Sequence, residues 1–270
     1  MVKKFMNIET KLVHAGEPNP RIGNAVSMPI FQSSTFESVG DPEYYDIKYL
    51  RLNNTPNHEV LHDKLAALEN GEAALVTSSG MAAISTTLLT LLSCGDHLLY
   101  QKGLYGGTHE LITKNFRSLG IDFDVIDGND PDTWVENLKS RTKAIYVEVL
   151  TNPLLEVADL NRVVEFARSN QLTAIIDNTF ATPVNFCPLD FGFDLSLHSG
   201  TKYLNGHSDI VAGAVIGRGD LIREIRKKLA YLGGTLDPHT CFLLHRGMKT
   251  LCVCPSLGRS AKYILLASQA

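Results

Sequence analysis

The stretch that decides the fold is residues 73–101, AALVTSSGMAAISTTLLTLLSCGDHLLYQ. It opens with a short apolar run at residues 73–77, which predicts a buried strand, and continues into residues 81–92, whose pattern predicts a helix. A second apolar run at residues 98–101 predicts the next strand. Strand, helix and strand in this order form the unit from which a parallel sheet with covering helices is built.

The same alternation continues along most of the remaining chain. Further strands are predicted at residues 123–126, 144–149, 173–176, 195–198 and 211–216, and further helices at residues 108–119, 131–140, 160–169 and 221–232. We find no internal repeat. The pattern favours an α/β fold in which a mostly parallel sheet carries helices on both faces.

The segment before this alternation has a different composition. Prolines and glycines interrupt it repeatedly, at Pro18, Pro20, Pro29, Pro42, Pro56, Gly16, Gly23 and Gly40. We therefore expect an extended N-terminal arm over residues 1–58, with little core of its own. Such an arm packs on another surface, for example that of a neighbouring subunit.

Composition and charge narrow the function classes. The 270 residues are 44% hydrophobic and 20% charged, as in an ordinary globular protein. The net charge of -4 and the pI of about 6.1 give no indication of a surface for nucleic acid or anionic membranes. No apolar run is long enough to span a bilayer, and residues 1–7 do not resemble a secretory signal. We expect a cytoplasmic protein that binds neither membrane nor nucleic acid.

Polar residues follow the predicted strands, and in a parallel sheet ligands bind at the carboxyl ends of strands. Ser79, Gly80 and Met81 open a helix directly after the first strand. Free amide groups at a helix start bind phosphate, and glycine allows close approach, although a serine-capped turn has the same appearance. The sequence contains neither G-x-G-x-x-G nor a Walker lysine. It therefore lacks the main motif that would indicate binding of a dinucleotide or of a nucleoside triphosphate.

Two charged residues lie at later strand ends. Asp177 ends a fully apolar strand, where an unpaired charge is costly, so a protonated pyridine nitrogen or a structural salt bridge would be its partner. Lys202 lies among small and hydroxyl residues, which suits a desolvated Schiff-base lysine, although a surface lysine is the simpler reading of spacing alone. Ser199 and Thr201 of the same loop can bond a phosphate. With Tyr105 to stack on a ring, the set contains what pyridoxal phosphate requires.

A rival motif lies earlier in the chain. Residues 58–62, HEVLH, match H-E-x-x-H, which on a helix places His58 and His62 on one face with Glu59 as a base, as in zinc hydrolases. The extended G-x-x-H is absent, because Leu65 and Leu68 occupy its places. No third ligand is evident, so we predict no metal site. The five cysteines also lack metal or redox spacing and are expected to be free thiols.

Five segments together resemble the Cys/Met-metabolism family of pyridoxal-phosphate enzymes, which contains cystathionine γ-synthase, cystathionine β- and γ-lyases and methionine γ-lyase. They are residues 79–83 (SGMAA), 104–108 (LYGGT), 151–153 (TNP), 176–180 (IDNTF) and 199–207 (SGTKYLNGH). The match extends from about residue 10 to residue 250. It implies a fold type I pyridoxal-phosphate transferase with a large cofactor-binding domain over residues 59–250.

The resemblance also implies a role for each site residue. Lys202 would carry pyridoxal 5'-phosphate as an internal aldimine, and Asp177 would pair with the pyridinium nitrogen. Tyr105 would stack on the ring and shuttle protons, and Asn152 would bond the phenolic oxygen. The phosphate would be held by Ser79, Gly80, Met81, Ser199 and Thr201. Tyr49 and Arg51 match a Tyr-x-Arg element that reaches the phosphate of a neighbouring subunit, which implies a homo-oligomer built as a dimer of dimers.

The expected activity is a pyridoxal-phosphate-dependent carbon–sulfur lyase or γ-replacement transferase that acts on cystathionine or a related sulfur amino acid. The sequence does not separate these reactions. Family members continue into a smaller C-terminal domain, whereas this chain stops at Ala270, so residues 251–270 are expected to be a truncated or divergent start of that domain. The alternative is a truncated, non-catalytic subunit that binds the cofactor or full-length partners.

Overall fold

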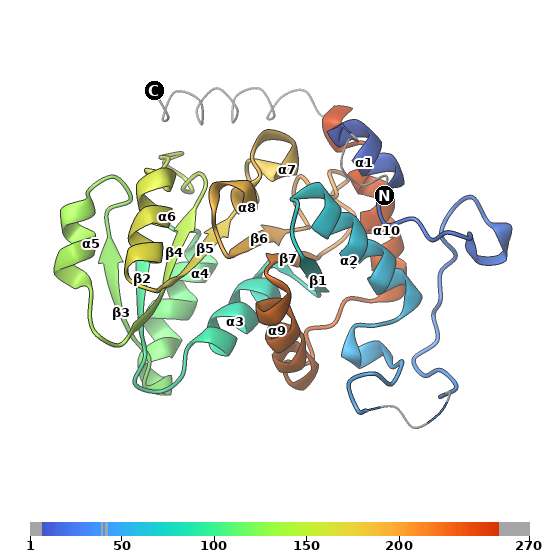
Figure 1. Ribbon diagram of the computed structural model, residues 1–270, viewed down its shortest axis with the longest axis horizontal. Coiled ribbons are helices and arrows are strands. Elements are labelled where there is room, and N and C mark those ends of the chain that lie inside the picture. Colours follow the sequence, from blue (N-terminus) through green and yellow to red (C-terminus); the bar gives the residue numbers. More distant parts are fainter. Residues whose placement is uncertain (1–6, 39, 41–42, 254–270) are drawn as a thin grey trace.

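The computed structural model describes residues 7–38, 40 and 43–253. Over these residues a seven-stranded sheet forms the centre of the molecule, in the order β1-β7-β6-β5-β4-β2-β3 (Figure 1). The strands are β1 Ala73–Thr77, β2 His97–Gln101, β3 Asp122–Ile126, β4 Thr142–Glu148, β5 Thr173–Asp177, β6 Leu195–Ser199 and β7 Gly213–Gly217. Only β7 runs against its neighbours, β1 and β6, so the mostly parallel sheet is confirmed.

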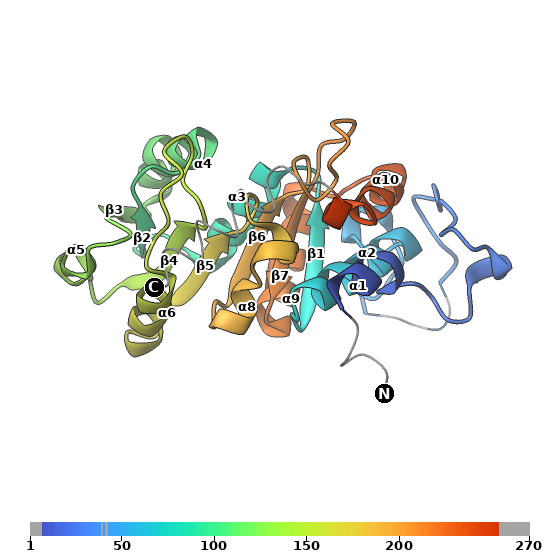
Figure 2. The ribbon, with the colours of Figure 1, turned by 90° about the horizontal axis from the view of Figure 1, so that it is seen from above.

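Helices cover both faces of the sheet, and the central strands β4 and β5 are accordingly buried over nearly their whole length. On one face lie α3 (Gly80–Leu91), α9 (Gly219–Leu232) and the helical segment that begins with α4 (Gly106–Glu110). On the other face, α5 (Pro131–Asn137) and α6 (Leu160–Ser169) pack against the half of the sheet that contains β4. Figure 2 shows β1, β6 and β7 along their length, with α2 and α10 beside β1.

A third apolar cluster lies beside β1 and β7. It joins α1 (Ile8–His14), α2 (Pro56–Leu68) and α10 (Pro238–Met248) to the sheet. The short helices α7 (Thr182–Asn185) and α8 (Pro188–Phe191) precede β6.

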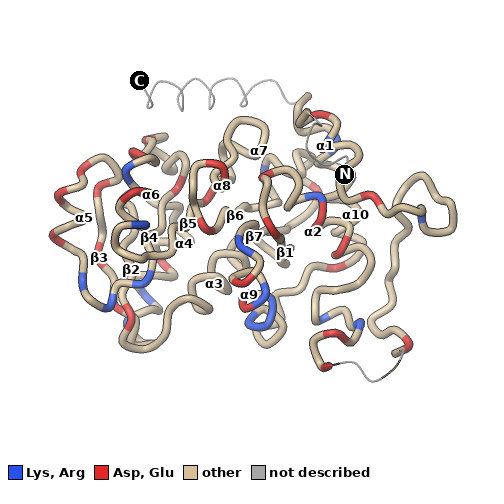
Figure 3. Tube along the Cα trace, viewed as in Figure 1, with Lys and Arg blue, Asp and Glu red and all other residues tan. Residues whose placement is uncertain are grey.

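Local sequence signals explain where several helices begin. Ser79 caps α3 by accepting the backbone N–H of Ala82 at 3.0 Å. Asp159 caps α6 in the same way, through the N–H of Arg162. Pro131 occupies the first turn of α5, where a missing N–H costs nothing. On α9, Ile222, Ile225 and Leu229 face the core, and Figure 3 shows Lys and Arg gathered along the same helix.

The structure differs from the sequence prediction in several elements, and the helices α7, α8 and α10 were not predicted. The helix expected at 108–119 is continuous but changes type, with a π-helix at Leu111–Phe116 and a 3-10 turn at Arg117–Leu119. Helix α5 ends at Asn137 rather than at 140. Helix α1 was not predicted from the sequence; Leu12 on it is buried against the cluster that contains Leu61 and Leu65.

Between α1 and α2 the chain has the short turns Ile22–Asn24 and Leu50–Leu52 and one isolated bridge, Thr35 to Tyr49. The boundaries of the arm and of the large domain remain predictions. Of the predicted C-terminal segment 251–270, Leu251–Val253 form a 3-10 turn, and the remainder lies outside the described residues.

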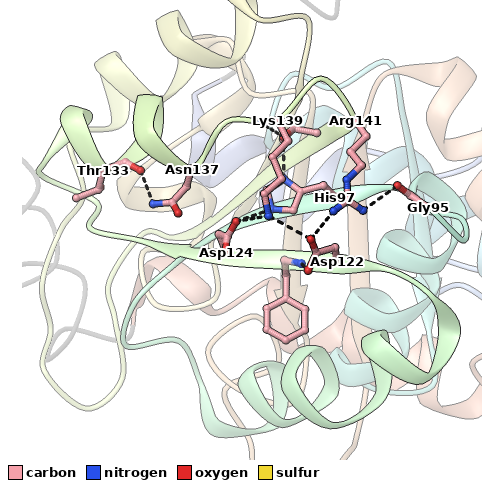
Figure 4. Close-up of polar contacts among 10 residues, drawn as sticks. Gly95, His97, Asp122, Asp124, Thr133, Asn137, Lys139 and Arg141 are labelled. Atoms are coloured by element: carbon pink, nitrogen blue, oxygen red, sulfur yellow. Dashed lines mark hydrogen bonds and ion pairs between the residues drawn. The ribbon is translucent and has the colours of Figure 1, made fainter.

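A cluster of charged residues occupies the amino-terminal edge of β2, β3 and β4 (Figure 4). Lys139 Nζ lies 2.5 Å from Asp124 and 3.1 Å from Asp122, and Arg141 lies 2.6 Å from Asp122. The buried ring of His97 lies 3.2 Å from Asp124. We call these five residues the edge cluster. It ties three strands together at the end opposite the predicted ligand site.

Candidate active site

A cavity of about 360 Å³ opens at the carboxyl ends of the parallel strands. Its size suits a ligand of cofactor dimensions. Nine of the eleven residues predicted for the site line it: Ser79, Gly80, Met81, Tyr105, Asn152, Asp177, Ser199, Thr201 and Lys202. These residues are far apart in the sequence, and the strand ends bring them together, as the sheet prediction required.

The start of α3 forms one wall of the cavity. A Cβ atom added at Gly80 would lie 2.8 Å from the Cβ of Ser199, so a larger residue would push α3 away from the end of β6. The glycine therefore allows Ser199 and the free N–H groups of the first α3 turn to face the same space. Hydroxyl groups beside a helix amino terminus suit an anion such as a phosphate.

Asp177 lies at the last position of β5. Its carboxyl accepts the backbone N–H of Thr179 at 2.9 Å and lies 3.5 Å from the Tyr146 hydroxyl. Burial raises the pKa of Asp177, while the hydrogen bonds from Thr179 and the charge of His198 act in the opposite direction. No ion pair among the described residues neutralises this carboxyl. A buried acid in this state favours a cationic ligand group.

A second acid, which was not among the predicted site residues, lines the same cavity. Glu148 ends β4 directly beside Asp177 in the sheet register. Burial and the neighbouring Asp177 raise the pKa of Glu148 to about 8. The Glu148 carboxyl accepts the backbone N–H of Tyr105 at 2.8 Å. The reasoning that selected Asp177, an acid ending an apolar strand, would also have selected Glu148, but the predicted strand 144–149 ran past it.

A buried hydrogen-bonded pair, His198 and Glu69, lies where β5 and β6 end. His198 Nε2 donates to Glu69 Oε1 at 2.6 Å, and Asn178 donates to the same oxygen at 2.9 Å. His198 precedes Ser199 and Asn178 follows Asp177, so this pair holds the two strand ends that carry predicted site residues. Sequence spacing gave no signal for it, because Glu69 is more than a hundred residues from both partners.

The lysine loop follows β6. The backbone N–H of Lys202 donates to Ser199 O at 3.1 Å, which makes a tight turn. The Thr201 hydroxyl accepts the N–H of Ala212 at 3.0 Å, and the Thr179 hydroxyl accepts the N–H of Ser199 at 2.8 Å. The side chain of Lys202 lines the cavity but is exposed. The desolvation expected from the sequence is therefore absent from this structure, because the cavity opens to solvent at the lysine.

Tyr105 follows β2 and Asn152 follows β4, and both line the cavity. The Tyr105 side chain is 47% exposed, and its ring lies close to Gly107, where an added Cβ would be 2.7 Å from Cε1. Asn152 follows β4 and begins a cis peptide bond with Pro153. Both side chains are placed where they can contact a ring bound at the cavity.

Tyr49 and Arg51 do not line the cavity of their own chain. The Arg51 guanidinium donates to Ala230 O at 2.9 Å and to the Tyr44 hydroxyl at 2.8 Å. It also lies 5.3 Å from the centre of the Tyr49 ring. Arg51 is therefore not placed to contact a ligand in the cavity of its own chain. Its predicted contact with the phosphate bound by a neighbouring subunit stays a prediction.

The structure gives the zinc reading of residues 58–62 no support. Both ring nitrogens of buried His58 are occupied, by the Thr55 hydroxyl at 2.7 Å and by Leu236 O at 2.7 Å. Glu59 pairs with Lys48 instead of facing His62. Over the described residues, no three His, Cys, Asp or Glu side chains are arranged to hold a metal ion. The helix α2 is therefore a packing element.

The cavity fits a pyridoxal phosphate in its chemistry as well as its size. Asp177 supplies the buried anion for a pyridinium, the hydroxyls and the α3 amino terminus face a phosphate, and Lys202 supplies an amine. Among the described residues that line the cavity, Lys202 is the only cation. A further cation from outside this cavity would therefore strengthen the binding of a phosphate dianion.

The fold is that of the fold type I pyridoxal-phosphate-dependent enzymes. The family model described as "Cys/Met metabolism PLP-dependent enzyme" matches residues 9–256, and the chain belongs to that family. The family is pyridoxal-phosphate-dependent, which confirms the cofactor expected from the sequence.

Relatives with different activities match this chain equally well. A Bacillus subtilis protein named cystathionine gamma-synthase/O-acetylhomoserine (thiol)-lyase is 38% identical over 91% of this chain. Cystathionine beta-lyase of the same organism is 40% identical over 93% of it. The chain spans 65% and 64% of these relatives, about two thirds of their length.

A solved structure gives the same assignment of fold. The O-acetylhomoserine (thiol)-lyase from Campylobacter jejuni, described as putative and solved with a pyridoxyl-lysine monophosphate residue, has a TM-score of 0.86 and 30% identity. The match covers 92% of this chain and 71% of that one. In the described residues, no helix has the length and apolar character needed to cross a membrane.

Proposed function

We propose that this chain acts as a carbon–sulfur lyase or γ-replacement transferase on cystathionine or a related sulfur amino acid, with pyridoxal phosphate held at Lys202. The observation that carries the proposal is the partly buried Asp177 carboxyl, with its raised pKa, in the cavity that Lys202 also lines. A carboxylate there stabilises a protonated pyridine nitrogen. The bound cofactor would then withdraw electrons from the α-carbon of an amino acid.

Each side chain has a task in this proposal. Lys202 Nζ holds the cofactor covalently and, once released, accepts the proton from the substrate α-carbon. Tyr105 covers the ring face and takes part in proton transfer. Asn152 orients the ring through its phenolic oxygen. The phosphate-binding residues are Ser79, Gly80, Met81, Ser199 and Thr201.

A second subunit completes the site in this proposal. The cavity contains one cation among its described lining residues, whereas the phosphate is a dianion. Arg51, with Tyr49 beside it, would supply the second cation from a neighbouring copy, in a homo-oligomer assembled as a dimer of dimers. An amino-acid substrate also carries a carboxylate, and this cavity offers it no arginine among the described residues.

Product analysis tests the proposal and separates the reactions. The purified protein is incubated with pyridoxal phosphate and cystathionine. Cleavage at the γ-carbon releases cysteine, 2-oxobutyrate and ammonia, and cleavage at the β-carbon releases homocysteine, pyruvate and ammonia. With O-acylhomoserine and cysteine, replacement gives cystathionine and a free carboxylic acid.

One of these product sets, formed only with cofactor, is the expected result. Cofactor binding at Lys202 without any of these products would contradict the catalytic proposal and favour a non-catalytic, cofactor-binding subunit.

A further inference from the structure

Glu148 lines the cavity, but none of the roles proposed above belongs to it. It ends β4, is 4% exposed, and lines the cavity beside Asp177. Its own backbone N–H is bonded to the Gln101 side chain at 3.0 Å, so its main chain is fixed at the end of the sheet. Its carboxyl is thereby held at one place, facing the loop that follows β2.

That loop carries Tyr105 as the last residue before α4. Gly103 in the loop has a φ of +77°, a conformation that favours glycine, and the chain then turns toward the helix. Tyr105 O accepts the N–H of His109 as part of the first α4 turn. The Tyr105 N–H donates to Glu148 Oε1 at 2.8 Å, which links the start of α4 to the centre of the sheet.

The chemical nature of the acceptor is unusual. A neutral amide or carbonyl oxygen would satisfy the Tyr105 N–H, whereas a buried acid next to another buried acid costs free energy. Burial and Asp177 raise the pKa of Glu148, in agreement with this cost. Because this raised pKa keeps the carboxyl protonated near neutral pH, its oxygen accepts the Tyr105 N–H in an uncharged form, as a glutamine side-chain oxygen would.

We propose that Glu148 is a positioning residue of this site: its carboxyl group accepts the Tyr105 N–H and so fixes the phenol ring over the place where the cofactor ring binds. This inference rests on the proposed function, because Tyr105 faces a cofactor only if one binds at Lys202. Glu148 acts through Tyr105 and makes no covalent contribution.

A double-mutant cycle on cofactor affinity tests this. The dissociation constant of pyridoxal phosphate is measured for the unchanged protein, Glu148→Ala, Tyr105→Ala and the double variant. Loss of one hydrogen bond to an ionisable acceptor predicts about 10-fold weaker binding for Glu148→Ala. Because both changes remove the same ring contact, the double variant should bind as weakly as Tyr105→Ala alone. Glu165→Ala, on the exposed face of α6, is the matched control and should bind normally.

Two further readouts separate positioning from general damage. Glu148→Gln keeps an oxygen acceptor of the same reach, so its affinity should stay within about 2-fold of the unchanged protein. The visible circular dichroism of the bound cofactor, which depends on the asymmetric placement of the ring, should weaken in Glu148→Ala and persist in Glu148→Gln. If Glu148→Ala does not fold, the Gln variant and its dichroism carry the test.

The outcomes are distinct. Additive losses in the cycle, or normal affinity in Glu148→Ala, would overturn the inference and leave the proposed function intact. A large loss in Glu148→Gln would also overturn it, because charge rather than hydrogen bonding would then be the cause. If the unchanged protein bound no cofactor at Lys202, the proposed function itself would fail, and this inference with it.

Discussion

At the amino-terminal edge of β2, β3 and β4, each Lys, Arg and Asp side chain of the edge cluster has an oppositely charged partner within 2.6 Å. At the carboxyl edge of the same sheet, the buried Glu148 and the partly buried Asp177 lie side by side, with raised pKa values. The first arrangement stabilises the fold by itself. The pair of acids at the carboxyl edge costs free energy unless a cationic group binds beside it. Such an arrangement is expected of a binding site.

The largest effect should come from the amine that faces the two acids. Lys202→Ala removes both the covalent anchor and the base, so turnover should fall by a factor on the order of 1,000 or more. Lys143→Ala, at an exposed position of β4, is the control and should keep full activity. Steady-state rates with saturating cofactor provide the measurement, and substantial residual activity in Lys202→Ala would refute the assignment.

Asp177→Asn should separate stability from function. The amide oxygen can still accept the Thr179 N–H, but the buried charge is gone, so the cofactor-free protein should gain about 1 kcal/mol in free energy of unfolding at pH 9. Activity with cofactor should drop by at least about 10-fold, because the pyridinium loses its partner. Thermal melts and rates test both parts. A cofactor-free variant less stable than the parent would contradict the comparison of the two edges.

The raised pKa of Glu148 predicts that the free energy of unfolding of the cofactor-free protein depends on pH. Its pKa is raised from 4.5 to about 8, so between these values the folded chain holds a proton that the unfolded chain has lost. Stability from this group is therefore complete below pH 4.5 and decreases as the pH rises to about 8, by at most about 1.4 kcal/mol per pH unit.

Glu148→Gln should remove this slope, and the exposed Glu165→Gln should keep it. Urea unfolding at pH 5, 6.5 and 8 would measure the slope in all three proteins. Equal slopes in the parent and in Glu148→Gln would show that the two carboxyl groups do not repel one another as described.

The smallest effect should come from the edge cluster. Lys139→Met leaves Asp122 and Asp124 with fewer compensating charges, but these side chains are about one third exposed, so the loss should be about 1 kcal/mol. Cofactor affinity should not change, because the cluster lies at the other end of the sheet. Urea unfolding and cofactor titration of the same variant check both points. A clear loss of affinity would show that the two edges are coupled.

Much of the fold could be predicted from the sequence because apolar strands and capped helices leave local signals. The run at 73–77 and the cap at Ser79 are examples, and each strand appears in the structure within two residues of its prediction. Helix α1 was missed because only Leu12 on it is buried, so its pattern is too short for periodicity to detect. The π-helical turn depends on packing that no local pattern encodes.

The candidate site was predictable to a similar extent. Asp177 was selected because it directly follows an apolar strand, and Lys202 because it lies in a loop of small and hydroxyl residues after a later strand. The family resemblance then gave each of them its expected role. Glu148 was missed because the predicted strand ended one residue too late. The pair of Glu69 and His198 depends on a contact across the fold, which a single sequence does not reveal.

The central claim is that the lysine after β6 holds pyridoxal phosphate beside the buried acids. It is tested most directly by incubating the purified protein with pyridoxal phosphate, reducing it with borohydride and mapping the labelled peptide. The account predicts a visible absorption band before reduction and a stable adduct on Lys202, with no label in Lys202→Ala. An absent band, or an adduct only on other lysines, would contradict it.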